Sequence, residues 1–211
     1  MPELIVFVHG MANFAHNRVS KKYQEQLVRA QIGARHKFIG AFDDSGNFAF
    51  VTPHSSSTLQ ADILAALRQR CDVKGAVVID RTRVANALSD LENIARAKYG
   101  NRFQAWDYTV WKNGERWKLG FVFLDISTGL NLASTNRLQG FQNAHVEVLS
   151  VQGNIVGVLK FDPKKPRVPW GVPASDVASV VAGGTSSLVA TGRSARTIRG
   201  ILRIFQHFRH P

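Results

Sequence analysis

The chain has 211 residues, of which 45% are hydrophobic and 20% charged, so it is long enough and apolar enough to fold around a buried core. No apolar run approaches the roughly 20 residues that span a bilayer, and the apolar start of the chain lacks the basic residues and cleavage site of a signal peptide, so we expect no membrane span. The single cysteine, Cys71, excludes an internal disulfide or a cysteine-based zinc site and fits a reducing, cytoplasmic setting.

Residues 1–80 alternate short apolar runs with helix signals. Four continuous apolar runs predict strands, at residues 4–8, 38–42, 48–51 and 76–79. Ser20 can cap a helix through Ile32, Ser57 can cap a second helix, and the turn formers at 43–46 join the second and third strands. The helix faces predicted to be buried hold Tyr23, Leu27 and Ala30 in the first helix and Leu59, Ile63 and Leu67 in the second. This β-α-β-β-α-β order predicts an α+β fold that opens with a ferredoxin-like unit over residues 1–80.

Residues 81–211 predict a second α+β unit closed by two C-terminal helices. A long helix over 82–98 comes first, followed by hairpins around Asn113-Gly114 and Gln152-Gly153. A proline-rich link over 163–169 interrupts regular structure. Pro173 suits the first turn of one closing helix, and Ser194 can cap the other. The face of the last helix predicted to be buried holds Ile198, Ile201, Leu202, Phe205 and Phe208.

Several short motifs recur in the order found in one bacterial family. They are Ser45-Gly46-Asn47 in the first hairpin, Val77-Val78-Ile79-Asp80-Arg81-Thr82 at mid-chain, Phe121-Val122-Phe123-Leu124 in a later strand, and Thr191-Gly192-Arg193-Ser194-Ala195-Arg196-Thr197-Ile198 at the last helix. On these motifs the chain resembles the bacterial domain-of-unknown-function family 1697 over nearly its whole length. The resemblance implies a fold and no particular activity. The RGINVGG loop that opens members of that family is replaced here by His9-Gly10-Met11-Ala12-Asn13-Phe14-Ala15.

Basic charge is concentrated near the end of the chain. The formal net charge is +12, and residues 164–211 hold eight Lys and Arg residues against one acid, Asp176. A surface of one sign attracts anions such as nucleic acid, phosphate ligands or acidic proteins. The sequence therefore predicts an anion-binding surface in this region.

The last helix carries the candidate site. Arg196, Arg199 and Arg203 recur every three or four residues and so share one stripe, and no acid follows Asp176 to balance them. Arginine binds phosphate oxygens in a bidentate manner. The other residues predicted to join this nucleic-acid-binding face are Arg193, Lys164, Lys165 and Arg167. We interpret the chain as a non-catalytic module that binds nucleic acid or another polyanion. The alternatives are an assembly protein that docks an acidic protein partner and an enzyme of unrecognised type.

The sequence leaves any catalytic residue unidentified, and it predicts no cofactor and no metal site. The strand and turn ending at His9-Gly10 resemble the start of an α/β-hydrolase, but the G-x-S-x-G motif of those enzymes is missing. His207 and His210 share one helical turn without an acid to complete a metal site. One hairpin is rich in aromatic residues beside Lys112, Arg116 and Lys118, which fits either base stacking or simple hairpin packing. Its aromatic residues are Trp106, Tyr108, Trp111 and Trp117.

Overall fold

The structure is a computed structural model that describes residues 1–11, 19–125, 135–162, 171–183 and 188–209. The protein is of the α+β class and divides into two compact units, Met1–Val84 with Arg199–Pro211 and Ala85–Ile198. Each unit contains one sheet in which all neighbouring strands are antiparallel. Within the described ranges, none of the helices has the length and apolar character that crossing a membrane requires.

The first unit begins with the predicted order of elements. These are β1 (Glu3–His9), α1 (Lys21–Ile32), β2 (Lys37–Ala41), β3 (Asn47–Val51), α2 (Ser56–Arg68) and β4 (Gly75–Asp80). The strands lie in the order β2-β3-β1-β4, so β1 occupies the middle and pairs with both β3 and β4. The apolar runs at 4–8 and 48–51 form the two central strands, and every residue of those two runs is buried. Antiparallel pairing across the 43–46 turn confirms the predicted hairpin.

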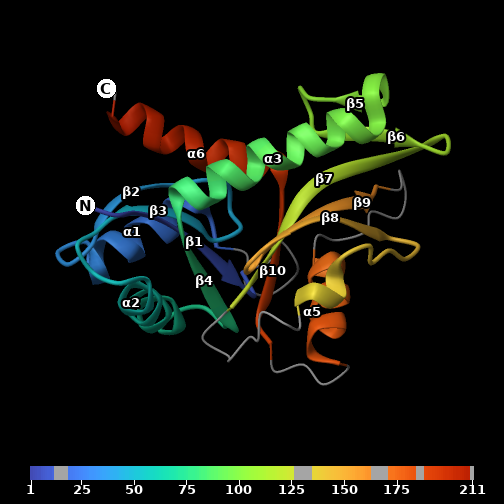
Figure 1. Ribbon diagram of the computed structural model, residues 1–211. Coiled ribbons are helices and arrows are strands. Elements are labelled where there is room, and N and C mark those ends of the chain that lie inside the picture. The colour runs from blue at the N-terminus through green and yellow to red at the C-terminus, as the bar shows by residue number, and fades with distance from the viewer. Residues whose placement is uncertain (12–18, 126–134, 163–170, 184–187, 210–211) are drawn as a thin grey trace. The chain divides into compact units, whose positions relative to one another are not determined.

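Helices α1 and α2 cover one face of this sheet (Figure 1). The α2 side chains predicted to be buried are buried, but the helix is capped by Ser55 rather than Ser57. The predicted face of α1 was wrong, because Tyr23 and Ala30 are exposed. Its buried residues are Gln24, Val28 and Ile32. The Gln24 Nε2 group donates to the carbonyls of Val19 and Asp44 at 2.6 and 2.9 Å, whereas its buried Oε1 accepts no hydrogen bond from the described residues.

The C-terminal helix α6 (Ala195–Arg209) divides between the two units, and its residues from Arg199 onward belong to the first. This part of α6 lies on the sheet face opposite α1 and α2 (Figure 1). A Cβ atom at Gly200 would lie 2.3 Å from the Phe42 ring, and one at Gly40 would lie 3.0 Å from Ile204. The predicted division into 1–80 and 81–211 therefore differs from the structure. The end of the chain belongs to the first unit because the apolar side of α6 is buried against that unit's sheet.

The second unit contains the other elements of the described ranges. They are α3 (Arg81–Tyr99, from Ala85 onward), η1 (Gly100–Arg102), β5 (Phe103–Gln104), β6 (Thr109–Lys112), β7 (Glu115–Leu124), η3 (Asn136–Leu138), β8 (Val146–Gln152), β9 (Ile155–Phe161), α5 (Gly171–Ala182) and β10 (Ala190–Ser194). Its sheet has the order β5-β6-β7-β9-β8, with β10 also paired to β7. Both predicted hairpins are present, and Asn113 and Gly114 have the positive φ values, 53° and 76°, that a two-residue turn needs.

The two faces of this second sheet are covered by different helices. Val156 and Val158 of β9 pack in a core with α5, whereas a Cβ atom on the intervening Gly157 would lie 2.9 Å from Leu91 of α3. Since side chains alternate along a strand, α3 and α5 cover opposite faces (Figure 1). Strand β10 was not predicted from the sequence. Its residues, Ala-Thr-Gly-Arg-Ser, contain no apolar run, so pairing with β7 rather than local propensity makes it a strand.

Gly46 provides a test of the first hairpin. Its φ is +69°, and a Cβ atom there would lie 2.9 Å from Val8 and 3.1 Å from Met11. Gly46→Ala should lower the free energy of unfolding by about 2–3 kcal/mol, since a left-handed backbone costs about 1–2 kcal/mol and the close contact adds to it. Gly114→Ala is the matched control, because Gly114 also has a positive φ but has open space around it, so about 1 kcal/mol is expected. Equal losses in urea unfolding would show that the contact with Val8 has no energetic weight.

Candidate functional site

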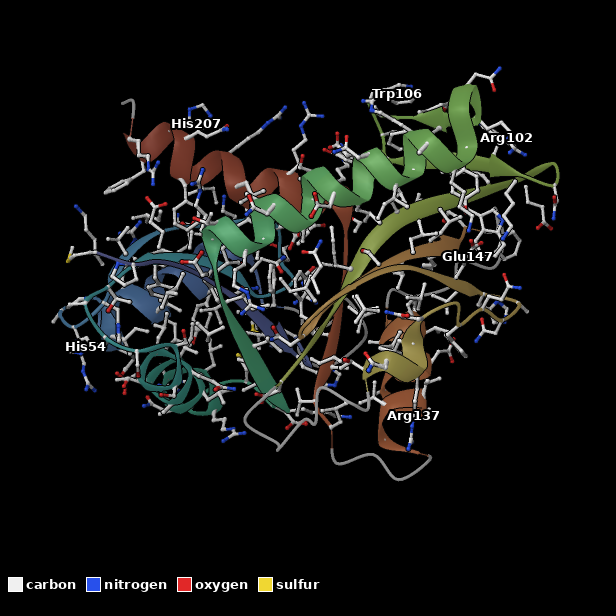
Figure 2. All side chains as sticks on the ribbon, viewed as in Figure 1. His54, Arg102, Trp106, Arg137, Glu147 and His207 are labelled. Carbon is white, nitrogen blue, oxygen red and sulfur yellow. The ribbon has the colours of Figure 1, made fainter. Side chains whose placement is uncertain are left out.

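Three arginines of α6 form one exposed stripe, which we call the arginine stripe. It consists of Arg196, Arg199 and Arg203, all exposed. On the other side of the helix, Ile198, Ile201 and Phe205 are completely buried. The backbone N–H of Thr197 donates to Ser194 Oγ at 3.0 Å, so the helix begins where the sequence predicts. His207, labelled in Figure 2, is exposed farther along the same helix.

Two arginines of the stripe lack an ion pair among the described residues, whereas the last arginine of the helix has one. Within the described ranges, Arg196 and Arg203 form no ion pair, whereas Arg199 takes part in a further interaction. Arg209 makes a bidentate pair with Glu3, with Nε and Nη2 at 2.9 and 2.7 Å from the two carboxylate oxygens. Arg196 and Arg203 therefore keep charges that an external anion can neutralise.

Of the other residues predicted for this face, Arg193 is described and does not belong to the stripe. Arg193 lies on β10, where its Nη1 donates to Thr191 Oγ1 at 2.6 Å and to the Gly192 carbonyl at 2.9 Å. These bonds hold the side chain along its own strand. Lys164, Lys165 and Arg167 lie outside the described residues.

The aromatic residues of the β5–β6–β7 region do not form one platform. Trp106 is 77% exposed and Trp111 is 41% exposed, whereas Tyr108 and Trp117 are buried. Trp106 and Tyr108 would share a face if one strand ran through both residues, but β6 begins only at Thr109 and Tyr108 has a positive φ of 57°. The backbone turns at Tyr108 and directs its ring into the core, so the shared face is lost.

The second unit contains a buried ionic centre that the sequence did not reveal. The Glu147 side chain is only 7% exposed, and its two oxygens accept from Lys98 Nζ at 2.5 Å and from Lys112 Nζ (Figure 2). The Tyr99 hydroxyl donates to the same carboxylate at 3.1 Å. Burial alone would raise the pKa of Glu147, but the hydrogen bonds and charges of the two lysines outweigh it and lower the pKa. Burial and the adjacent carboxylate raise the pKa of Tyr99, so its hydroxyl stays protonated.

Glu147→Gln should destabilise the protein by about 1–2 kcal/mol at neutral pH, because a neutral amide replaces a carboxylate that accepts charge-assisted hydrogen bonds. The lowered pKa of Glu147 contributes stability above the unfolded value of 4.5, and this contribution is lost as the pH falls through the folded pKa. The difference between wild type and variant should therefore shrink below about pH 4.5. Thermal unfolding across a pH series measures it, with Glu115→Gln, at an exposed position, as the matched control. A difference that does not vary with pH would contradict this role.

Lys160, on β9, is another buried ionisable group of this unit, with 2% exposure. Burial lowers its pKa to about 8; Asp162 opposes this shift and Lys118 adds to it. Lys118 itself pairs with Asp162 at 2.8 Å. A lysine with this pKa is partly neutral and nucleophilic near pH 8, but the same burial closes it to solvent.

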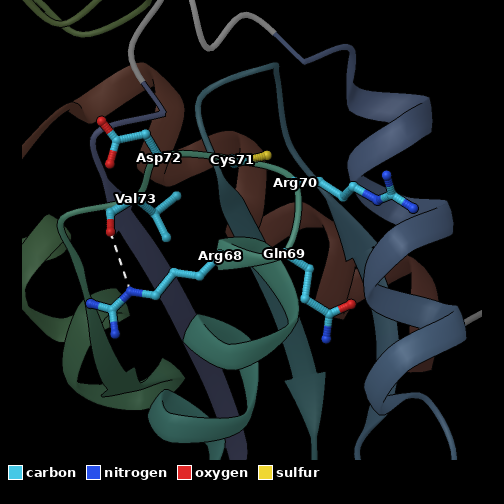
Figure 3. Close-up of a pocket in the computed structure, with 6 residues that line it drawn as sticks. All are labelled: Arg68, Gln69, Arg70, Cys71, Asp72 and Val73. Carbon is cyan, nitrogen blue, oxygen red and sulfur yellow. Dashed lines mark hydrogen bonds between the residues drawn. The ribbon is translucent and has the colours of Figure 1, made fainter.

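A hollow of about 650 Å³ lies beside the end of α2 and the loop that follows it, and it is lined by residues 68–73. Figure 3 shows the guanidinium groups of Arg68 and Arg70 pointing to opposite sides of this loop. Arg68 Nε lies 3.4 Å from the Val73 carbonyl. Burial raises the pKa of the Cys71 thiol, so it is not an activated nucleophile. The hollow thus lacks converging polar groups.

Comparison with known proteins bears on the fold. No family model and no curated protein matches this sequence. A solved structure with a similar fold is that of the conserved bacterial protein SP0830 from Streptococcus pneumoniae, with a TM-score of 0.50 and 14% identity. The similarity covers 96% of this chain and 98% of that one. At this identity it establishes the fold alone: the chain is similar, over nearly its whole length, to a conserved bacterial α+β protein.

Proposed function

We propose that this protein is a non-catalytic module that binds nucleic acid or another polyanion through the arginine stripe of α6. The observation that carries the proposal is the separation of the two sides of this helix, with three exposed arginines on one and fully buried Ile198, Ile201 and Phe205 on the other. Like charges three or four residues apart repel by about 0.2–0.5 kcal/mol, and a bound anion would remove that cost. Guanidinium groups also match the geometry of phosphate oxygens.

An acidic protein partner is the second candidate. The Arg209–Glu3 pair favours it, because an arginine of the same helix already binds a carboxylate in a bidentate manner. The two candidates differ in salt dependence. Binding to duplex DNA releases condensed counterions, so the logarithm of affinity falls steeply and linearly with the logarithm of salt concentration.

Direct binding measurements test the proposed function. The wild-type protein is titrated into fluorescently labelled duplex and single-stranded oligonucleotides at several salt concentrations, and its ultraviolet spectrum is examined for co-purified nucleic acid. Sequence-independent binding with a steep salt slope is expected. Absence of salt-sensitive binding to both oligonucleotides would reject the nucleic-acid proposal in favour of the protein partner.

Three further assignments belong with this proposal. We class the first unit as ferredoxin-like, supported by the β2-β3-β1-β4 strand order with antiparallel neighbours. We regard the chain as a divergent relative of the bacterial domain-of-unknown-function family 1697, supported by its motif order. We place it in the cytoplasm, where a single buried thiol such as Cys71 stays reduced.

A further inference from the structure

A buried histidine holds an acidic side chain of α2 in a fixed position. His36 is completely buried; its Nδ1 lies 2.9 Å from Thr52 Oγ1 and its Nε2 lies 2.7 Å from Asp62 Oδ2. An ionised carboxylate only accepts hydrogen bonds, so Nε2 donates to Asp62. Thr52 is also completely buried, so it cannot meet a substrate, and its hydroxyl serves to fix the imidazole. The chain of bonds therefore orients Asp62.

Arg35 brings a guanidinium group to the same carboxylate. Its Nη1 donates to Asp62 Oδ2 at 2.8 Å, so Oδ2 accepts from both Arg35 and His36. Among the described residues, none donates a hydrogen bond to Asp62 Oδ1 or accepts one from Nε or Nη2 of Arg35. One acceptor and several donors thus stand side by side with capacity left for a ligand.

These groups open onto a hollow of about 250 Å³ between α1 and α2, close to the smallest volumes, about 300 Å³, of small-molecule pockets. Ile32 and Ala66 are buried and form its apolar floor, and the exposed Ala65 and Gln69 stand at its rim. The hollow is lined by residues of α1, of α2 and of the turn after α1, and these two helices cover the sheet face opposite the part of α6 that begins at Arg199 (Figure 1).

We propose that this hollow binds a small zwitterion: a free amino acid with an apolar side chain. The ammonium group would donate to Asp62 Oδ1, the carboxylate would accept from the remaining N–H groups of Arg35, and the side chain would cover Ile32 and Ala66. The charges of Asp62 and Arg35 cancel, so a simple cation or anion is attracted by one group and repelled by the other. A molecule that carries both charges satisfies both groups.

The test is a titration of the full-length, ¹⁵N-labelled protein, followed by NMR, with L-leucine, L-valine and L-methionine as separate probes. Saturable shifts of the Ile32, Ala65 and Gln69 amides are expected. N-acetyl-L-leucine lacks the ammonium group and L-leucinamide lacks the carboxylate, so each should bind about tenfold or more weakly, as expected for loss of a charge-assisted hydrogen bond. If either blocked compound binds as tightly as L-leucine, the proposal that the ligand is a zwitterion is wrong.

Two variants at exposed positions, each with a matched control, complete the test, and the NMR spectra of all four report directly on folding. Ala65→Trp should fill the hollow and abolish binding, whereas Ala61→Trp, at an exposed position of the same helix outside the hollow, should not affect it. Arg35→Gln should weaken binding about tenfold, with Arg70→Gln as its control. The proposal is rejected if none of the three amino acids gives saturable shifts, or if Ala65→Trp and Arg35→Gln bind as wild type does. Neither result depends on whether α6 binds nucleic acid.

Discussion

Replacing Phe205 with alanine is expected to lower the free energy of unfolding by about 3–5 kcal/mol, a large share of the stability of a typical domain. Phe205 is completely buried on the part of α6 that belongs to the first unit. Its truncation removes a large apolar side chain and leaves a cavity in the core. Phe208→Ala should cost less than about 1 kcal/mol, because Phe208 is 40% exposed and its ring lies beside Lys37, whose Nζ is 4.6 Å from the ring centroid.

Urea unfolding of both variants measures this contrast. A change in midpoint at constant slope would report stability alone. The helical pattern of the sequence predicts that both phenylalanines are buried, whereas the structure buries only Phe205. The comparison of the two variants therefore tests the structure against the prediction from the sequence. Similar losses for Phe205→Ala and Phe208→Ala would mean that α6 is rotated from the orientation described above.

The order of elements in the first unit could be predicted because its signals are local. The strands at 4–8 and 48–51 are continuous apolar runs, and turn formers separate the paired strands. The Asn113-Gly114 turn is equally local, since these two residues tolerate positive φ better than others do. Asp43 also serves as a turn former, with Oδ1 accepting from the Ser45 backbone at 2.8 Å and from the Asn47 amide at 2.7 Å.

The elements that escaped prediction depend on partners far along the chain. The buried side of α1 is set by Gln24, whose amide reaches the Asp44 carbonyl 20 residues away. Strand β10 exists because it pairs with β7. Helix α6 could be recognised from its periodicity, but its place in the first unit depends on contacts with β2, more than a hundred residues earlier.

The candidate sites likewise differ in whether they depend on one local segment or on residues far apart in the sequence. The arginine stripe could be predicted because its residues follow the helical repeat of one segment. Glu147 could not, since Lys98 is 49 residues away and Lys112 is 35 residues away in sequence. The Asp62 site likewise joins residues from α2 to His36, 26 residues earlier. An isolated histidine or glutamate in a sequence gives no sign of such partners, so these centres become visible only in the folded chain.

The largest effect on function is expected from neutralising the arginine stripe. Replacing Arg196, Arg199 and Arg203 together by Gln keeps helix propensity nearly constant and leaves the buried side of α6 unchanged. If each arginine contacts one phosphate, the salt-dependence slope should fall by about 2.7 on duplex DNA or about 2.1 on single strands. The same relation gives a loss of affinity of several hundredfold for duplex DNA near 0.1 M salt.

The matched control removes the same charge from positions outside α6. Lys22, Arg70 and Lys74 are exposed and lie outside α6, so their joint replacement by Gln should reduce the slope much less. Thermal unfolding of both triple variants is run beside the binding curves, because Arg199 also takes part in an interaction within the chain. A stripe variant that folds like wild type and binds with unchanged slope and affinity would identify the stripe as a solvated helix face. Equal losses in the two triple variants would instead attribute binding to net charge, since position on α6 would then have no effect.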